Sequence, residues 1–323
     1  MNIANRYAIN LDDIRSAAAR IGDHTIRTPV VSSQSLNDSL HSQVFFKCEN
    51  LQHIGAFKAR GACNAVLSLS EERASAGVVT HSSGNHAAAL ARAAKIRGIQ
   101  AHIVMPHDSA AVKLAAVRSL GVDPTFSEPD SESRQAVADS VIKQTGATFV
   151  HPFNNPDVMA GQGTVATELL EQVPELDIIV APVGGGGLLS GILVAAKSIN
   201  PSIQVIAAEP EWADDAYRSL QSGKIESPTR YDTIADGLRT LLGELTFPII
   251  RDLVDGVLLV SEQSIRLATR AILQQAKVVA EPSGAVSLAA VMSNTHQFEG
   301  KRVGVIISGG NVQPEILAQI LKA

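Results

Sequence analysis

The sequence predicts an α/β protein with two lobes, each a mostly parallel sheet flanked by helices. Along most of the 323 residues, short apolar runs alternate with amphipathic stretches, and turns rich in Gly, Pro or Asn join them. This alternation is typical of parallel sheets covered by helices on both faces. The chain is also long enough to build two hydrophobic cores.

The first group of elements runs from Gly77 to about Phe149. Strands are predicted at GVVTH, QAHIVMP and DPTFSE, and helical stretches separate them. Gly98 closes an Ala-rich helix and Gly146 closes the helix that begins at SESRQ, because glycine readily takes the left-handed conformation that ends a helix. These segments are expected to form one small sheet.

The second group of strands is predicted at DIIVAPV, QVIAAE, GVLLVS and RVGVIIS, and the earlier segment QVFFKC must pair with one of the two sheets. We therefore expect a large domain made of residues 1–75 and 153–323, and a small, mobile domain made of residues 76–152. Clefts between two such lobes are preferred ligand sites.

Composition and charge argue against several function classes. Charged residues make up 18% of the chain and the net charge is −5, with both signs interspersed, so we expect no nucleic-acid partner. We see no signal peptide and no apolar segment long enough to span a membrane. The two cysteines, Cys48 and Cys63, indicate no disulfide framework and suit reduced thiols in a cytoplasmic protein.

The strongest local signal is APVGGGGLLSGI, in which Gly184 to Gly187 separate a strand from an amphipathic helix. Such a turn can direct backbone N–H groups at an anion bound at the helix N-terminus. The alternative is a flexible turn, although four glycines weaken folding. Neither the dinucleotide fingerprint nor the P-loop spacing is present, so the run favours a single phosphate group.

Three other segments concentrate polar residues among apolar ones. Lys58, in GAFKARGA, is either a surface lysine or an amine kept reactive by partial burial. The turn HSSGNHA, from His81 to Ala87, is either a helix N-cap or a Ser-His nucleophile system, although the hydrolase pattern G-x-S-x-G is absent. The third segment, VIISGGNV, is a buried strand that ends in a turn at Ser308 to Asn311.

In this order, GAFKARGA, SSGNHA, GGGGLLSG and ISGGN resemble the motifs of the fold-type II pyridoxal-phosphate enzymes. More narrowly, they are similar to those of the serine/threonine dehydratase and serine racemase family. The resemblance runs from Arg27 to the last strand. It implies a tryptophan-synthase-β-like fold whose large domain binds pyridoxal 5′-phosphate, and a homodimer.

The resemblance also implies a role for each matching residue. Lys58 would form the imine with the cofactor aldehyde, and Phe57 would pack against the ring. Asn85 would hydrogen-bond the ring hydroxyl, and Ser308 would face the pyridine nitrogen, where a neutral hydroxyl suits elimination better than transamination. The phosphate would be held by Gly184, Gly185, Gly186, Gly187 and the backbone of Leu188.

The implied reaction is the elimination of a β-hydroxy amino acid to a 2-keto acid and ammonia. Lys58 would remove the α-proton, which requires a neutral amine. Ser83 either binds only the substrate carboxylate or acts as an acid/base opposite Lys58, which would add serine racemase activity. The α-carboxylate would be held by the turn of Ser82, Ser83, Gly84, Asn85 and His86.

The segment AAEPEWADDAYRS resembles the family's site for a divalent cation. Carried over, the ligands are Glu209, the carbonyl of Ala213, and Asp215, and such hard oxygen ligands suit Mg²⁺ or Ca²⁺. The alternative is a solvated acidic helix start.

The substrate is left open among serine, threonine and 3-hydroxyaspartate. THSSGNHA, HPFNNPDVMAGQGT and AEPEWADDAYRS look like the branch that acts on 3-hydroxyaspartate, so a hydroxyaspartate ammonia-lyase is an alternative principal activity. Arg134 would then bind the second carboxylate, and would otherwise be a solvated helix residue. From other classes, a nicotinamide-dependent oxidoreductase would use the glycine run and Glu209, and a catalytically silent binding protein would be expected to lack Lys58.

Overall fold

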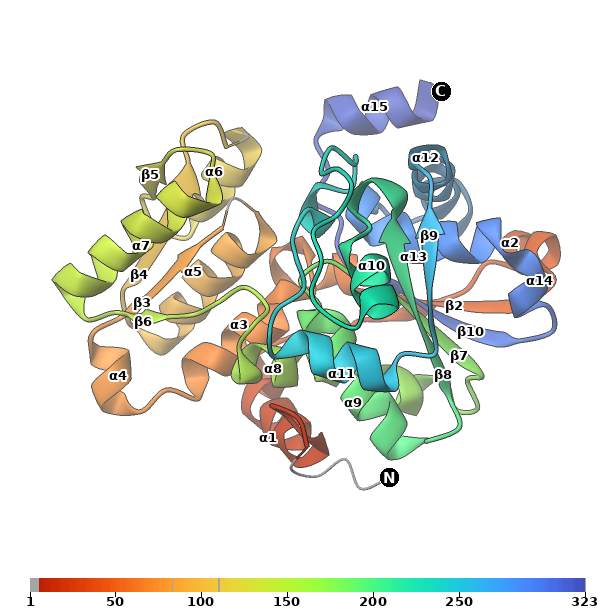
Figure 1. Ribbon diagram of the computed structural model, residues 1–323, viewed down its shortest axis with the longest axis horizontal. Helices are drawn as coiled ribbons and strands as arrows, with labels where there is room; N and C mark the ends of the chain where they lie inside the picture. The colour runs from red at the N-terminus through yellow and green to blue at the C-terminus, as the bar shows by residue number, and fades with distance from the viewer. Residues whose placement is uncertain (1–5, 83, 110, 323) are drawn as a thin grey trace.

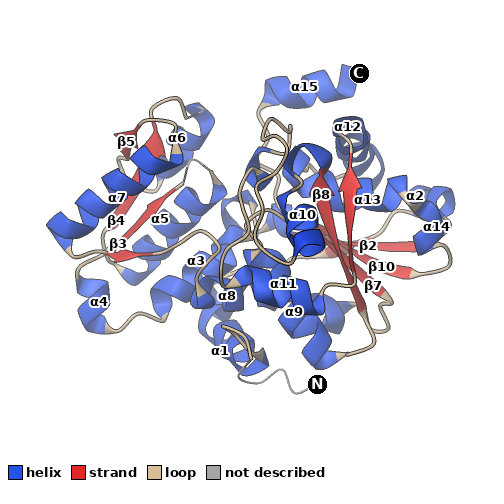
Figure 2. Cartoon of the chain, in the orientation of Figure 1, coloured by secondary structure: helices blue, strands red, loops and turns tan. Residues whose placement is uncertain are grey.

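The computed structural model describes residues 6–82, 84–109 and 111–322, in which ten strands form two separate sheets (Figures 1 and 2). The six-stranded sheet has the order β1-β2-β10-β7-β8-β9, and the four-stranded sheet has the order β5-β4-β3-β6. All strand pairs are parallel except β1 with β2. The predicted fold class is therefore confirmed.

The six-stranded sheet lies at the centre of the larger lobe. The predicted strand QVFFKC is β2, which pairs with β10 so that Phe46 lies opposite Val305. Alternate residues of each strand face opposite sides, and Ile179 and Val180 accordingly enter two different cores. The strands are β1 (Val30–Val31), β2 (Gln43–Cys48), β7 (Ile178–Pro182), β8 (Gln204–Pro210), β9 (Gly256–Val260) and β10 (Arg302–Ile307).

Helices cover both faces of this sheet. One core collects residues of α1 (Leu11–Ile21), α8 (Pro156–Gln172), α9 (Gly187–Ile199) and α11 (Thr246–Leu253). The other core collects residues of α2 (Gln34–Leu40), α12 (Glu262–Ala271) and α13 (Pro282–Ser293). The shorter helices α10 (Asp215–Ser222) and α14 (Thr295–Phe298) and the last described helix, α15 (Pro314–Lys322), complete the lobe.

The four-stranded sheet forms the second lobe together with its own helices. Its strands are β3 (Val78–His81), β4 (Ala101–Pro106), β5 (Thr125–Ser127) and β6 (Thr148–Phe149). Residues of α5 (Asn85–Arg97) and α6 (Ala111–Ser119) pack on one face, and residues of α7 (Ser131–Thr145) pack on the other. Gly98 and Gly146 end α5 and α7 in the left-handed conformation, as predicted. The domain boundaries at residues 75 and 153 and the mobility of the small domain stay predictions.

Helix α3 (Lys58–Leu67) lies between the two lobes (Figure 1). It packs against α5 of the small lobe and against α8 of the large lobe. The helix α4 (Glu71–Ser75) then leads into β3. Among the described residues, no helix combines the length and the apolar character needed to cross a membrane.

The contact between α3 and α8 depends on glycine. A Cβ at Gly161 would lie 2.7 Å from the Cα of Gly61 and 2.8 Å from the carbonyl oxygen of Arg60. Because neither atom belongs to a flexible side chain, the helices would have to separate. This close approach fixes the distance between the helix that begins at Lys58 and the helix beside it.

Gly161→Ala should therefore lower the free energy of unfolding by about 1–3 kcal/mol, the usual cost of overpacking a core. Gly22→Ala is the matched control, because a Cβ at Gly22 meets no atom within 4 Å and its φ is −51°. Thermal unfolding followed by circular dichroism compares the two variants. An unchanged melting temperature in Gly161→Ala would show that this helix contact is not tight.

Candidate active site

Lys58 and Ser308 lie side by side because the chain before α3 pairs with the chain after β10. Ala56 and Gly309 form an isolated antiparallel bridge, and the amide of Phe57 donates to the carbonyl oxygen of Ser308 at 3.1 Å. The left-handed conformation of Gly55, with φ +70°, turns the chain into this bridge. Three of the predicted cofactor contacts, Phe57, Lys58 and Ser308, thus come together.

The amine of Lys58 lies in a partly buried position. Its Nζ donates to the carbonyl oxygen of Pro152 at 2.8 Å and lies 5.2 Å from the ring centroid of Phe57. Burial lowers the pKa of Lys58 to about 8, because the charged form loses its hydration there. A far larger share of this amine is therefore neutral near pH 7 than in an ordinary lysine.

The four glycines form a tight loop between β7 and the N-terminus of α9. A Cβ at Gly185 would lie 2.4 Å from the ring of Phe153, and one at Gly186 would lie 2.7 Å from the Thr246 hydroxyl. Gly186 has φ +86° and is the N-cap of α9. These positions therefore have no room for a side chain, and the backbone of the loop stays uncovered by side chains of its own. Because the first N–H groups of a helix have no intrahelical partner, the N-terminus of α9 can offer N–H donors at this loop.

The side-chain amide of Asn85, the first residue of α5, is hydrogen-bonded through both its nitrogen and its oxygen. Its Nδ2 donates to Glu281 at 2.8 Å, and its Oδ1 accepts from Nδ2 of Asn311, also at 2.8 Å. Asn311 gives its other donor to the carbonyl oxygen of Ile54. Counting the described residues only, one N–H of Asn85 therefore remains for a further acceptor, since a side-chain amide has two donors.

The predicted carboxylate-binding turn lies between β3 and α5. The Ser82 hydroxyl accepts from the amide of Gly84 at 3.3 Å. His86 turns its imidazole to the carbonyl oxygen of Val150, and burial, followed by the charge of Lys58, lowers its pKa to about 3. His86 thus remains neutral at physiological pH. Ser83 lies outside the described residues.

Arg134 lies in α7 near the end of β3. Its Nε donates to the carbonyl oxygen of Asp130, and the neighbouring Gln135 hydrogen-bonds the ring of His81 at 3.0 Å. Burial lowers the pKa of His81, and the positive charge of Arg134 adds to that effect. Arg134 is therefore close to the strand that leads into the Ser82 turn.

The predicted cation ligands gather beside the end of β8. Both oxygens of Glu209 accept N–H groups of the first turn of α10, from Ala216 and Tyr217, while Oδ2 of Asp215 accepts from Leu242. Oδ1 of Asp215 is buried and has no partner among the residues that the structure describes. Burial raises the pKa of Glu209, and the charge of Asp215 raises it further. Within the described chain, no group of three His, Cys, Asp or Glu side chains converges as a metal site.

Sequence reasoning missed several residues of this site. Glu281, Asn311, the carbonyl of Pro152 and the ring of Phe153 all touch predicted residues. Thr240 was also missed; its buried hydroxyl lies 3.4 Å from the position of a Cβ on Gly184 and has no partner within the described chain. Pro152, Phe153 and Asn311 lie inside the quoted segments HPFNNPDVMAGQGT and ISGGN, but nothing in those segments marked them as contacts of the site. Glu281 and Thr240 lie outside every quoted motif.

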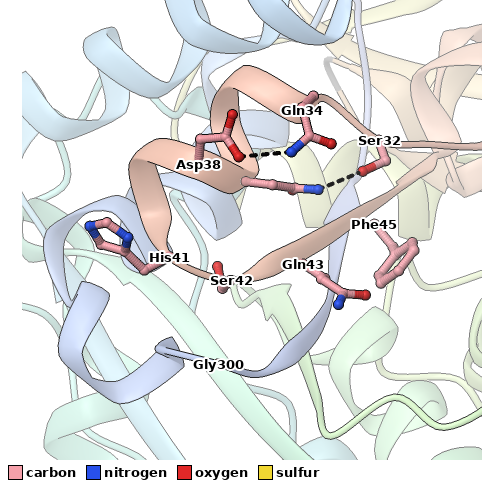
Figure 3. A pocket seen from close by; sticks show the side chains of 9 residues that line it. Ser32, Gln34, Asp38, His41, Ser42, Gln43, Phe45 and Gly300 are labelled. Carbon is pink, nitrogen blue, oxygen red and sulfur yellow. Dashed lines mark hydrogen bonds between the residues drawn. The ribbon is translucent and has the colours of Figure 1, made fainter.

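A separate cavity of about 470 Å³ lies between α2 and β2 (Figure 3). Its polar side chains pair with one another, Gln34 with Asp38 and Asn37 with Ser32. It contains none of the predicted site residues, so we place the candidate active site at Lys58.

Residues 21–309 match the family model described as "Pyridoxal-phosphate dependent enzyme". This chain belongs to that family. It is 49% identical over 320 residues to serine racemase from Oryza sativa subsp. indica, covering 98% of this chain and 94% of the relative. It is 47% identical over 306 residues to β-hydroxyaspartate dehydratase from Paracoccus denitrificans, covering 95% of this chain and 97% of the relative. The structure of maize serine racemase superposes with a TM-score of 0.94 at 49% identity, covering 98% of each chain.

The residues present fit the cofactor of this pyridoxal-phosphate family. The glycine loop offers a cradle for a phosphate, and the buried Thr240 hydroxyl beside it has no partner within the described residues. Lys58 offers an amine with a lowered pKa, and Asn85 has one N–H left for a ring oxygen. The buried Ser308 offers a neutral hydroxyl for a ring nitrogen.

Glu281 should make the stability of the protein depend on pH. Burial, followed by the charge of Asp236, raises the pKa of Glu281 to about 8. The folded state then binds a proton that the unfolded state releases near its ordinary pKa of 4.5. Stability from this group is present below that pH and is lost as the pH rises towards 8.

In the wild type, the melting temperature should fall as the pH rises from about 5 to 8, and Glu281→Gln should make this fall smaller. Melting temperatures of the variant and the wild type, measured in steps across this range, test the effect. The exposed Glu299→Gln is the control. Parallel curves for wild type and Glu281→Gln would contradict the buried, protonated carboxyl.

Proposed function

We propose that this protein uses pyridoxal phosphate to eliminate water from a β-hydroxy amino acid, whose dehydrated product then takes up water to give a 2-keto acid and ammonia, and that it also racemises serine. The observation that carries this proposal is the convergence of an amine with a lowered pKa, a glycine loop, Asn85 and Ser308 at one place. Relatives named serine racemase and β-hydroxyaspartate dehydratase, each at 47% identity or more, support the choice of reaction.

Each residue around the amine has a defined task. Lys58 carries the cofactor through its Nζ, and Gly184 to Gly187 with the Leu188 amide hold the phosphate. Pyridoxal phosphate, when bound, withdraws electrons from the α-carbon of the amino acid. Asn85, fixed by Glu281 and Asn311, orients the ring. Ser308 contributes a hydroxyl rather than a charge, and Phe57 packs beside the amine.

Once the amine of the substrate has replaced Lys58 on the cofactor, the freed Nζ of Lys58 would be the base that takes the α-proton. Burial favours the neutral amine, which has a free electron pair to accept this proton. The carbonyl oxygen of Pro152 accepts a hydrogen bond from the amine and thereby holds its direction. The substrate carboxylate binds at Ser82, Gly84 and the first N–H groups of α5, including those of Asn85 and His86.

Ser83 is the second acid/base, on the face opposite Lys58. Sequence resemblance alone supports this role. Two groups on opposite faces of one α-carbon are what racemisation requires, whereas elimination from one enantiomer requires only Lys58.

A second candidate for the principal activity is the elimination of ammonia from 3-hydroxyaspartate. The observation that favours it is the place of Arg134, beside the strand that leads into the Ser82 turn. A guanidinium there can pair with a second carboxylate, which serine and threonine lack. The relative named β-hydroxyaspartate dehydratase supports the same substrate.

A divalent cation, Mg²⁺ or Ca²⁺, binds at Glu209, the Ala213 carbonyl and Asp215 in this proposal. The buried, unpartnered Oδ1 of Asp215 supports it, because a carboxylate oxygen seldom remains buried without a partner. We further propose a homodimer, a mobile unit of residues 76–152 and a cytoplasmic location, for which the buried free thiols of Cys48 and Cys63 are suitable.

The test is keto-acid release from the purified protein with L-serine, L-threonine and the 3-hydroxyaspartate isomers, with D-serine measured as a second product of L-serine. Lys58→Ala should lose the covalently attached cofactor, seen by borohydride reduction and mass spectrometry, and should lose all keto-acid release. Turnover that survives in Lys58→Ala would refute the assignment.

The same assay separates the two candidate activities. Oxaloacetate formed far faster than pyruvate or 2-ketobutyrate would favour the hydroxyaspartate activity, and Arg134→Met should then raise KM for that substrate selectively. Arg118→Met, an exposed arginine in α6, is the control. A preference for serine that Arg134→Met leaves unchanged would remove Arg134 from the site.

Removal of the cation should lower both melting temperature and activity, because the paired buried carboxylates of Glu209 and Asp215 would lose their counter-charge. Chelation followed by return of Mg²⁺ or Ca²⁺ tests this in one sample. Asp215→Asn should abolish the response to the chelator. If chelation changes neither quantity in the wild type, the cation site is wrong.

A further inference from the structure

Two residues after Lys58, Arg60 lies at the centre of a buried group of four charged side chains. We call Lys47, Glu49, Arg60 and Glu168 the Arg60 cluster. Lys47, Glu49 and Arg60 are fully buried, and the Glu168 side chain is 16% exposed. Two cations face two carboxylates, so the cluster carries no net formal charge.

All three nitrogens of the Arg60 guanidinium are engaged. Nε and Nη2 donate to the two oxygens of Glu49 at 2.8 and 2.9 Å, and Nη1 and Nη2 donate to the two oxygens of Glu168 at 2.6 and 2.8 Å. Further bonds reach the Thr164 hydroxyl and the carbonyl oxygen of Ile26. This fork geometry fixes both the position and the rotation of the group, which a lysine could not do.

The cluster joins α3 to three other segments of the large lobe. Glu49 follows β2, Glu168 lies in α8, and Ile26 precedes β1. Lys47 reinforces the assembly by donating to Glu168, Gln172 and the Thr28 carbonyl oxygen. The chain just before α8 also supplies the carbonyl oxygen of Pro152, which accepts a hydrogen bond from the Lys58 amine. α8 and the residues leading into it therefore contact both Lys58 and Arg60.

Stability alone is a weak reason for such a cluster. Removing four charges from water is costly, and replacing buried ion pairs by apolar residues is often neutral or stabilising. A direct electrostatic effect on the Lys58 amine is also small, because the cluster is formally neutral and burial alone accounts for the lowered pKa of Lys58. The remaining consequence is geometric, since α3 cannot rotate or slide while Arg60 is held.

We propose that Arg60 is a positioning residue that aims the Lys58 amine at the substrate α-carbon. This inference rests on the proposed function, in which Lys58 removes the α-proton. Proton transfer is sensitive to the distance and angle between donor and acceptor, so a small rotation of α3 slows it without weakening substrate binding.

Arg60→Lys keeps the positive charge but loses the paired hydrogen bonds of the guanidinium to Glu49 and Glu168. We expect kcat to fall about 10- to 100-fold, the scale of a misplacement near 1 Å, with KM changed less than about threefold. The deuterium isotope effect on kcat with α-deuterated substrate should rise, because proton removal becomes slower than the other steps. Without substrate, the circular dichroism band of the bound cofactor should change in amplitude, because its covalent attachment at Lys58 has turned.

Arg27→Lys is the matched control. Arg27 also joins the chain before β1 to α8, through Glu171 at 2.8 Å, but both side chains are more than half exposed. We expect kcat, the isotope effect and the cofactor band of this variant to match the wild type.

Glu168→Gln is the second variant, because it removes one charge of the cluster at a partly exposed side chain. Glu168→Gln should also lower kcat, raise the isotope effect and change the amplitude of the cofactor band, each less than Arg60→Lys does. The proposal is overturned if Arg60→Lys keeps kcat and the isotope effect within twofold of wild type while only its melting temperature falls. It is also overturned if both variants fail to fold, since the cluster would then be needed for folding.

The failure of this proposal can be told from a failure of the proposed function. If the wild-type protein releases no keto acid from any substrate, the proposed reaction is wrong, yet the cofactor band of Arg60→Lys still reports the position of Lys58. If the wild type is active and Lys58→Ala is not, an unchanged Arg60→Lys removes only the positioning role.

Discussion

The packing of α3 against α8 is the contact on which the rest of the site depends. Gly61 and Gly161 let the two helices approach within van der Waals contact of their backbones. That approach places the first residue of α3, Lys58, beside the carbonyl oxygen of Pro152, which precedes α8. α3 also contacts α5 of the small lobe. A change in this one crossing would move Lys58 relative to both sheets.

The interior around the amine favours uncharged groups. His86 and His151 are neutral at physiological pH because burial lowers the pKa values of both, to about 3 and about 4. Burial raises the pKa of Glu281 to about 8, so this carboxyl is mostly protonated at neutral pH. The cations that remain nearby, Arg60 and Lys47, are balanced by Glu49 and Glu168. A site of this kind lets burial alone set the protonation of Lys58.

Local features of the sequence were sufficient for the glycine loop and for all described strands except the two-residue strands β1 and β6, which were not predicted. The spacing of apolar residues and the positions of turn residues are short-range signals. They were enough to predict most of the parallel strands and the helix-ending glycines Gly98 and Gly146. The contacts that complete the site are long-range. Asn85 meets Glu281 across 196 residues, and Lys58 meets Pro152 across 94.

Buried charges were the hardest to predict. In a sequence, Arg60 or Glu281 looks like any solvated residue of a helix, because charged side chains are seldom fully buried. Arg60 follows Lys58 in GAFKARGA, yet its partners Glu49 and Glu168 lie in separate segments, and only the tertiary fold brings the three together. A motif therefore singles out Lys58 but not the groups that hold the helix it begins.

The proposed site is divided between the two sheets, and this division would separate the choice of reaction from the choice of substrate. Lys58, the glycine loop and Ser308 belong to α3 and the large lobe, whereas Ser82, Gly84 and Arg134 belong to the small lobe. In the proposed function, the first set holds the cofactor and moves the proton, and the second set holds the carboxylates of the amino acid. Changes confined to β3 and α7 can therefore alter which β-hydroxy amino acid fits while Lys58 keeps its surroundings, whereas α5 carries Asn85 and packs against α3. A family with one cofactor site and relatives named for different substrates is what such a division permits.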